Sequence, residues 1–223
     1  MISYEVSRKQ KIFLGRFKKN KTKNQRSKYK NLMSVTTAGV DEVGRGSLIG
    51  PVYAAAVILN KSINKKILKD SKSITKKQRL YLCKYIKKNS MWAIGKASVK
   101  EIDKFNILYA SLLAMKRAIK KLKKKPSKVL IDGNKIPDLK NYNLKAIIRG
   151  DKKIPSISAA SIIAKVSRDK FVTVLSKRNK GYHWDKNFGY GTRQHLKALK
   201  KLGITKHHRK TFSPISKISS YNI

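Results

Sequence analysis

Acidic residues are scarce in this chain of 223 residues, which has 11 Asp and Glu against 55 Lys and Arg. The formal net charge of +44 repels itself unless salt or a polyanion screens it. Nucleic acid is therefore the first partner to expect, and an anionic membrane surface the second. An AT-rich genome also enriches Lys, Ile and Asn, so we interpret the sign of the charge rather than its size.

Cysteine and long apolar runs are equally rare. Cys83 is the only cysteine, which excludes an internal disulfide and a zinc site built from cysteines. The apolar run "YAAAVIL" is far too short to span a bilayer. The first residues, "MISYEVSRKQKIFLGRF", lack the apolar core and cleavage site of a secretory signal. We therefore expect a cytoplasmic protein with no membrane segment.

The charge and hydrophobic patterns divide the chain into three parts. Residues 1–35 carry eleven Lys or Arg and one acid, without hydrophobic periodicity. This part is expected to be a basic arm, disordered alone and drawn to phosphate, or a solvated tail without a specific role. Residues 36–180 predict a folded core, and residues 181–223 a C-terminal helical region.

Hydrophobic periodicity predicts both strands and helices in the folded part. Strands are expected at 36–44, 52–59, 91–99, 128–133 and 144–150. Helices are expected at 75–89, at 101–125 (where Pro126 ends the helix), at 156–178 and at 192–202. Because the strands come first in a run and then alternate with helices, the sequence predicts an α/β fold. Its centre would be a mixed five-stranded sheet flanked by helices.

Four of the scarce carboxylates come from apolar elements, where an unpaired charge is costly. Asp41 and Glu42 belong to the first strand, Asp132 ends the strand "KVLID", and Asp169 lies on the helix at 156–178. These acids could pair with the abundant Lys and Arg. They could instead converge on divalent cations, since hard oxygen ligands suit Mg²⁺ or Mn²⁺. Composition alone leaves both possibilities open.

Residue spacing adds two neighbours to Asp169. Ser161 and Lys165 precede it at intervals of four residues, so the three side chains share one helix face. Two other acids have a simpler interpretation, because Glu101 and Asp103 stand near the start of a helix, where the helix dipole favours negative charge.

Seven ordered blocks resemble the successive motifs of type 2 ribonuclease H (ribonuclease HII). They are "AGVDEVGRGSLIGPVYAAAVIL", "DSKSITKKQR", "EIDKFNILYASLLAMKRA", "VLIDGNKIP", "IPSISAASIIAKVSRD", "FGYGTRQH" and "HHRKTFSP". The resemblance runs from about residue 36 to 216. It implies a ribonuclease H-like core followed by a C-terminal substrate-binding region. It also implies hydrolysis of RNA in RNA–DNA hybrids and incision 5′ to single ribonucleotides in duplex DNA, leaving 5′-phosphate and 3′-hydroxyl ends. We expect the protein to be a monomer.

The resemblance assigns the catalytic and metal-binding roles to the four acids singled out above. These are Asp41, Glu42, Asp132 and Asp169. It implies two Mg²⁺ or Mn²⁺ ions, one activating a water for in-line attack and the other stabilising the leaving 3′-oxygen. The alternatives are a metal-independent ribonuclease with a histidine pair, and a basic structural nucleic-acid-binding protein without catalysis.

Six further residues receive substrate-binding roles from the resemblance. These are Gly44, Arg45, Gly46, Ser161, Lys165 and Tyr190. The Gly-Arg-Gly loop would read the 2′-hydroxyl, although Gly-x-Gly alone is more often a plain turn. Tyr190 would pack on the sugar at the RNA-to-DNA junction, or simply anchor its loop. Lys165 and Ser161 would support the site or contact phosphate, and packing in the core explains Ser161 equally well. Ser47 and Phe188 depart from the family pattern, which often has proline and a basic residue there.

Overall fold

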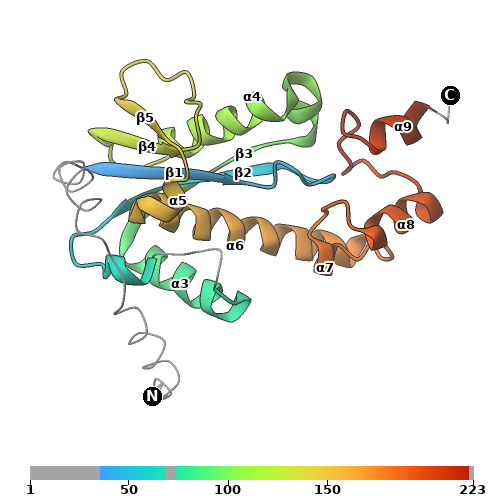
Figure 1. The fold of residues 1–223 in the computed structure, drawn as a ribbon, viewed down its shortest axis with the longest axis horizontal. Coiled ribbons are helices and arrows are strands. Elements are labelled where there is room, and N and C mark those ends of the chain that lie inside the picture. Colours follow the sequence, from blue (N-terminus) through green and yellow to red (C-terminus); the bar gives the residue numbers. More distant parts are fainter. Residues whose placement is uncertain (1–35, 69–73, 221–223) are drawn as a thin grey trace.

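A computed structural model describes residues 36–68 and 74–220, and the basic arm predicted at 1–35 lies outside the described residues (Figure 1). The strands are β1 (Thr37–Val43), β2 (Val52–Leu59), β3 (Ser90–Ala97), β4 (Lys128–Asp132) and β5 (Leu144–Ile147). They form one sheet in the order β3-β2-β1-β4-β5. β1 is antiparallel to β2 and parallel to β4, so the predicted mixed five-stranded sheet is confirmed.

Helices cover both faces of this sheet (Figure 1). The helices of the described residues are η3 (Lys65–Leu68), α3 (Lys76–Lys88), α4 (Val99–Lys120), α5 (Gly150–Lys153), α6 (Pro155–Arg178), α7 (Trp184–Asn187), α8 (Arg193–Leu202) and α9 (Ile215–Ser220), of which α4 covers one face and α3 and α6 the other. One apolar cluster fills the layer between the sheet and α4, and a second fills the layer under α3 and α6. A third joins the end of α6 to α7 and α8. Within the described residues, no helix combines the length and the apolar character needed to cross a bilayer.

Two glycines let the long helices pack directly on the strands. A Cβ added to Gly39 of β1 would lie 2.2 Å from the backbone carbon of Ser156 at the start of α6. A Cβ added to Gly95 of β3 would lie 2.0 Å from the carbonyl oxygen of Ala114 in α4. The backbones of α4 and α6 therefore lie directly against the sheet. This close contact fixes the position of α6, and of its polar side chains, relative to β1.

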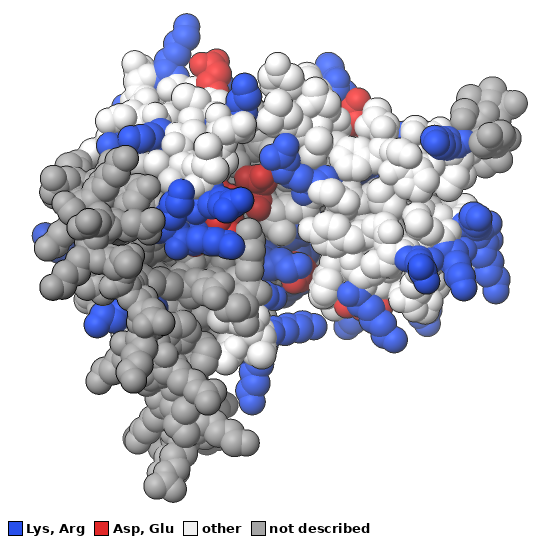
Figure 2. Space-filling model, viewed as in Figure 1, with Lys and Arg blue, Asp and Glu red and all other residues white. Residues whose placement is uncertain are grey.

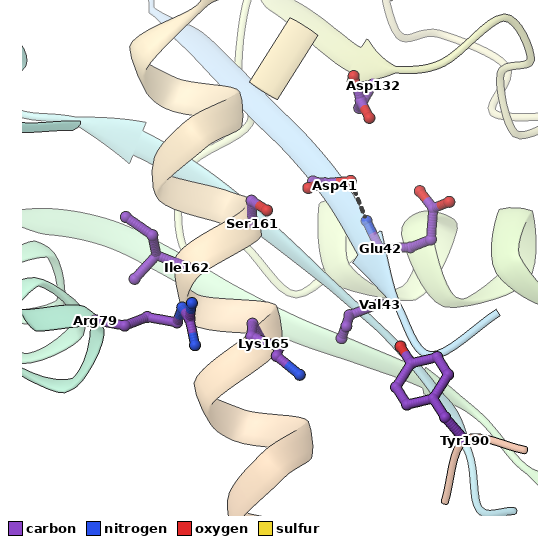
Figure 3. Close-up of a pocket in the computed structure, with 9 residues that line it drawn as sticks. All are labelled: Asp41, Glu42, Val43, Arg79, Asp132, Ser161, Ile162, Lys165 and Tyr190. Carbon is purple, nitrogen blue, oxygen red and sulfur yellow. Dashed lines mark hydrogen bonds between the residues drawn. The ribbon is translucent and has the colours of Figure 1, made fainter. Parts of the chain in front are cut away.

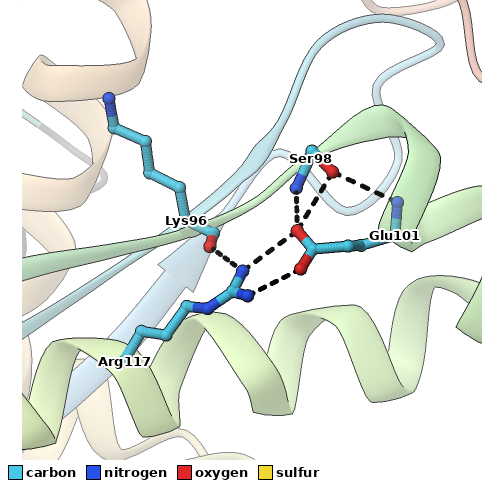
Figure 4. A network of polar contacts seen from close by, with 4 residues as sticks. All are labelled: Lys96, Ser98, Glu101 and Arg117. Atoms are coloured by element: carbon cyan, nitrogen blue, oxygen red, sulfur yellow. Dashed lines mark hydrogen bonds and ion pairs between the residues drawn. The ribbon is translucent and has the colours of Figure 1, made fainter.

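The helix expected over 101–125 is wrong in length and straightness. α4 ends at Lys120, before the lysine-rich stretch, and it turns sharply at Asn106, which has a φ of 64°. Arg117 Nη2 lies 2.6 Å from Glu101 Oε1, whereas a straight helix would rise about 24 Å over the 16 residues between them (Figure 4). The side chain of Asn106 accepts a hydrogen bond from the Leu108 amide at 2.9 Å and so begins the second helical segment.

The C-terminal part of the chain returns to the core beside α4 and the loop after β1. Asp103 lies beyond the first turn of α4, so its expected role at the helix start is wrong. Its carboxylate instead accepts a hydrogen bond of 2.8 Å from the Thr211 hydroxyl. The Gly50 amide donates to the His207 carbonyl at 2.8 Å. Residues 207–211 are thereby held next to the loop that carries the Gly-Arg-Gly sequence.

Candidate active site

A cavity of about 370 Å³ opens where β1 and β4 end beside α6 (Figure 3). Because these two strands are parallel, their carboxyl ends meet at one edge of the sheet. The cavity is lined by Asp41, Glu42, Val43, Arg79, Asp132, Ser161, Ile162, Lys165 and Tyr190. Three of the four predicted acids therefore share one cavity with three predicted substrate-binding residues. Figure 2 shows carboxylates near the centre of the molecular face that it displays, bordered by Lys and Arg side chains.

Asp41 is the most deeply buried of the carboxylates that line the cavity, with 6% of its surface exposed. Burial, and then the negative charges of Glu42 and Asp132, raise its pKa well above the usual range, against a hydrogen bond from Ser161. Burial also raises the pKa of Glu42, although Arg45 opposes this shift. The Arg45 guanidinium is 3.4 Å from Glu42 and faces solvent. The carboxylates are thus crowded together with too little positive charge to compensate them.

Asp132 is held by the backbone of the turn into α5. Its Oδ1 accepts hydrogen bonds from the amides of Gly150 and Asp151 at 2.6 and 3.3 Å. A Cβ on Gly150 would lie 2.6 Å from Ile157 Cδ1, so a larger residue there would displace the end of that side chain. Sequence reasoning did not single out Gly150, and Asp151 is buried in the first turn of α5.

Asp169 stands apart from the other three acids. It lies on α6, does not line the cavity, and pairs with Lys165, whose Nζ is 3.0 Å from Asp169 Oδ1. The same oxygen is buried and accepts no well-directed hydrogen bond, so its contact with Lys165 is an ion pair without hydrogen-bond geometry. Across residues 36–68 and 74–220, no three Asp, Glu, His or Cys side chains are gathered into a finished metal-binding cluster. Asp41, Glu42 and Asp132 line one cavity without forming such a cluster, and Lys165, which lines the same cavity, pairs with Asp169.

The Gly-Arg-Gly loop rests on two buried arginines that sequence reasoning missed. Arg209 donates to the carbonyl oxygens of Gly44, Arg45 and Gly50 at 2.7, 2.8 and 3.0 Å. Gly44 has a φ of +91°, and a Cβ there would lie 2.2 Å from Arg168 Nε, so both the backbone and the space require glycine. Burial lowers the pKa of Arg209 to about 9. The loop that follows Asp41 and Glu42 is therefore fixed from beneath by side chains distant in sequence.

Tyr190 lies in a second loop that is joined to the first. Its backbone forms a bridge with Ser47, and its hydroxyl points into the cavity (Figure 3). A Cβ on Gly46 would lie 4.0 Å from the Tyr190 ring, so the two predicted substrate-binding groups are neighbours. The Ser47 hydroxyl donates to the Phe188 carbonyl at 3.3 Å, which ties together the two positions that depart from the family pattern.

The histidines are not placed for catalysis at the cavity. His195 and His208 are buried, with exposures of 0% and 1%, and their Nε2 atoms are 3.4 Å apart. His195 Nδ1 lies 3.0 Å from the Tyr190 carbonyl oxygen, and its Nε2 accepts a hydrogen bond from the Trp184 indole at 2.9 Å. Burial lowers the pKa of His208 to about 4. This pair supports the Tyr190 loop and has no access to a substrate, which counts against the histidine-based alternative.

Known proteins are similar to this chain in sequence and in fold. A family model described as Ribonuclease HII matches residues 38–215. Ribonuclease HII of Pelagibacter ubique (strain HTCC1062) is 77% identical over 179 residues, which are 80% of this chain and 96% of that protein. Ribonuclease H2 from Pyrococcus horikoshii OT3 is similar in structure, with a TM-score of 0.68 and 26% identity over 83% of this chain and 97% of that one. Bst-RNase HIII, solved in complex with Mn²⁺, shares the fold, with a TM-score of 0.69 and 18% identity over 91% and 76% of the two chains. The chain therefore belongs to the ribonuclease HII family of metal-dependent endonucleases, which act on RNA–DNA hybrids.

Proposed function

We propose that this endonuclease also incises duplex DNA 5′ to single embedded ribonucleotides, leaving 5′-phosphate and 3′-hydroxyl ends. One observation carries the proposal. The cavity that gathers Asp41, Glu42 and Asp132 is bordered by Tyr190 and by the loop at residues 44–46. Groups suited to hydrolysis and groups suited to recognising one sugar are thus immediate neighbours.

Asp41, Glu42, Asp132 and Asp169 would hold two divalent ions, Mg²⁺ or Mn²⁺. The donor set fits, because carboxylate oxygens are the hard ligands that these ions prefer. Mutual repulsion and burial raise the pKa of Asp41, and Asp169 Oδ1 is buried without a directed hydrogen bond. Added positive charge would offset the repulsion around Asp41 and would give Asp169 Oδ1 a partner. The chemistry that such ions supply when bound is Lewis acidity at the attacking water and at the leaving 3′-oxygen.

The remaining residues of the site would bind and orient the nucleic acid. Lys165 and Arg79 bring positive charge to the cavity and would contact phosphate. The backbone of the loop at 44–46 would approach the ribose closely and read its 2′-hydroxyl, while Tyr190 would pack on the sugar at the junction. Ser161 would orient Asp41 by hydrogen bonding. The large positive charge would supply affinity that weakens steeply with salt.

This assignment gives each part of the chain a separate role. Residues 36–180 would form the catalytic core, and residues 181–223, which supply Tyr190 and Arg209, would form the substrate-binding region. The arm at 1–35 would add phosphate contacts. The monomeric state and the cytoplasmic location stay predictions from the sequence.

The test is incision of a duplex holding one ribonucleotide, with Mg²⁺, Mn²⁺ or EDTA, and with the product ends identified. Asp132→Asn should abolish incision and leave duplex binding largely intact, because one neutral amide oxygen replaces a charged ligand. Asp138→Asn, at an exposed loop position, is the matched control and should cut normally. Incision by Asp132→Asn at the wild-type rate would contradict the metal assignment. Cyclic phosphate ends or full activity in EDTA would indicate attack by the 2′-hydroxyl, and binding without any cleavage would indicate a structural binding protein.

A further inference from the structure

Lys165 makes two contacts that compete with the proposed role of Asp169. Its Nζ is 3.0 Å from Asp169 Oδ1, the buried oxygen that lacks a directed hydrogen bond. The same Nζ is 4.9 Å from the centre of the Phe188 ring. The two side chains of the ion pair are 28% and 15% exposed, so water screens this charge pair only in part. A positive side chain of the chain itself therefore lies against an oxygen of a proposed metal ligand.

A divalent ion and the Lys165 ammonium cannot occupy the same side of Asp169 together. Both are positive, and an ion binding at Oδ1 would meet the ammonium within a few ångströms, where like charges repel strongly. A divalent ion at Asp169 Oδ1 would therefore compete with the Lys165–Asp169 pair. The Phe188 ring offers the ammonium a favourable cation–π contact that does not depend on Asp169.

We propose that Lys165 is an internal counter-ion of Asp169 that holds down the affinity for divalent metal until substrate arrives. The inference rests on the proposed function, because it takes Asp169 to be a metal ligand. Lys165 also lines the cavity where a phosphate would bind. A phosphate there draws the ammonium away from Asp169 and leaves the carboxylate free for the metal. Metal binding and substrate binding then favour each other to the same extent, as thermodynamic linkage requires.

Calorimetric titration of Mn²⁺ into the full chain without nucleic acid measures this competition directly. Lys165→Met removes the ammonium and keeps the length of the side chain. Its Mn²⁺ affinity should be about fivefold tighter than that of the wild type, equivalent to about 1 kcal/mol. Asp169→Asn should bind Mn²⁺ more weakly. In the Asp169→Asn background, Lys165→Met should have no further effect, because the carboxylate that it uncovers is gone.

Lys170→Met is the matched control, because it removes the same charge from an exposed position on the same helix. An equal gain in affinity from Lys170→Met would reduce the effect to net charge and overturn the inference. An unchanged Mn²⁺ affinity in Lys165→Met, with Asp169→Asn weakened, would overturn the counter-ion role and leave the metal assignment standing. An unchanged affinity in Asp169→Asn would instead contradict the proposed ligand itself, and the counter-ion role with it.

Adding a duplex without ribonucleotides, which supplies phosphate but no cleavage site, provides the second measurement. In the wild type this duplex should tighten Mn²⁺ binding. In Lys165→Met the duplex should tighten Mn²⁺ binding by a smaller factor, because no ammonium pairs with the Asp169 carboxylate in that variant. Equal factors in the two proteins would contradict the proposed coupling.

Discussion

Replacing Arg209 with lysine should destabilise the fold and the Gly-Arg-Gly loop without changing the formal charge. Arg209 is fully buried and donates to three carbonyl oxygens, those of Gly44, Arg45 and Gly50, at 2.7, 2.8 and 3.0 Å. The guanidinium reaches all three because its donors point in fixed, divergent directions. A lysine ammonium has three donors, but all of them leave one nitrogen at the end of a flexible stem. It cannot reproduce the spread of the guanidinium over three carbonyl oxygens, and we expect it to keep one of the three hydrogen bonds.

The magnitude follows from the lost contacts. A hydrogen bond to a charged group contributes about 1.5–3 kcal/mol net to the free energy of unfolding. Losing two of them should therefore lower that free energy by at least about 3 kcal/mol. For a chain of 223 residues this corresponds to a Tm lower by about 6–12 °C. Incision next to a ribonucleotide should fall more than duplex binding does, because the loop backbone loses its support while the basic surface remains.

Urea denaturation measures the free energy of unfolding, and incision and filter-binding assays measure the two activities. Arg193→Lys is the control, because Arg193 is exposed on α8 and the same substitution there should stay within about 0.5 kcal/mol of wild type. An Arg209→Lys protein as stable as that control, with normal incision, would refute the idea that the buried guanidinium holds the loop.

Two further predictions concern packing and pH. Gly39→Ala should lower the free energy of unfolding by about 3 kcal/mol, because its Cβ would lie 2.2 Å from the backbone of Ser156, which cannot move aside as a side chain could. Gly191→Ala, with 3.4 Å between its Cβ and the nearest atom, should change the urea midpoint little. A hydrogen bond from Arg117 lowers the pKa of Glu101 from 4.5 to about 2, so the stability that this pair contributes is complete above pH 4.5 and is lost as the pH falls toward 2 (Figure 4). Because the pair is partly exposed, Glu101→Gln should lower the free energy of unfolding by about 1 kcal/mol at pH 7. The difference between wild type and variant in urea unfolding should be smaller at pH 3. A difference independent of pH would contradict this account.

The parts of the fold that sequence reasoning found are those where pattern and burial agree. β2 is a continuous apolar run because helices cover both faces of the sheet, and such a run is recognisable without a structure. The acids could be singled out because carboxylates are rare here and emerge from apolar elements. Their scarcity made Asp41, Glu42 and Asp132 conspicuous before their common cavity was known.

The features that sequence reasoning missed depend on contacts between distant parts of the chain. Arg168 and Arg209 are 2 of 55 basic residues, and nothing in their local sequence distinguishes a buried guanidinium from a solvated one. The apolar period of α4 continues across Asn106, so periodicity could not reveal the turn. The one local hint is that asparagine tolerates a positive φ better than most residues.

The contact between residues 207–209 and the loop at 44–50 also sets an order of events during protein synthesis. The five strands are all translated once Ile147 has been added, and folding of a nascent chain starts from its N-terminal part. The carbonyl oxygens of Gly44 and Arg45 meet their donor only after Arg209 has left the ribosome. A growing chain can therefore bring its strand-borne carboxylates together before the loop proposed to read ribose is held in place, so substrate discrimination would be acquired last.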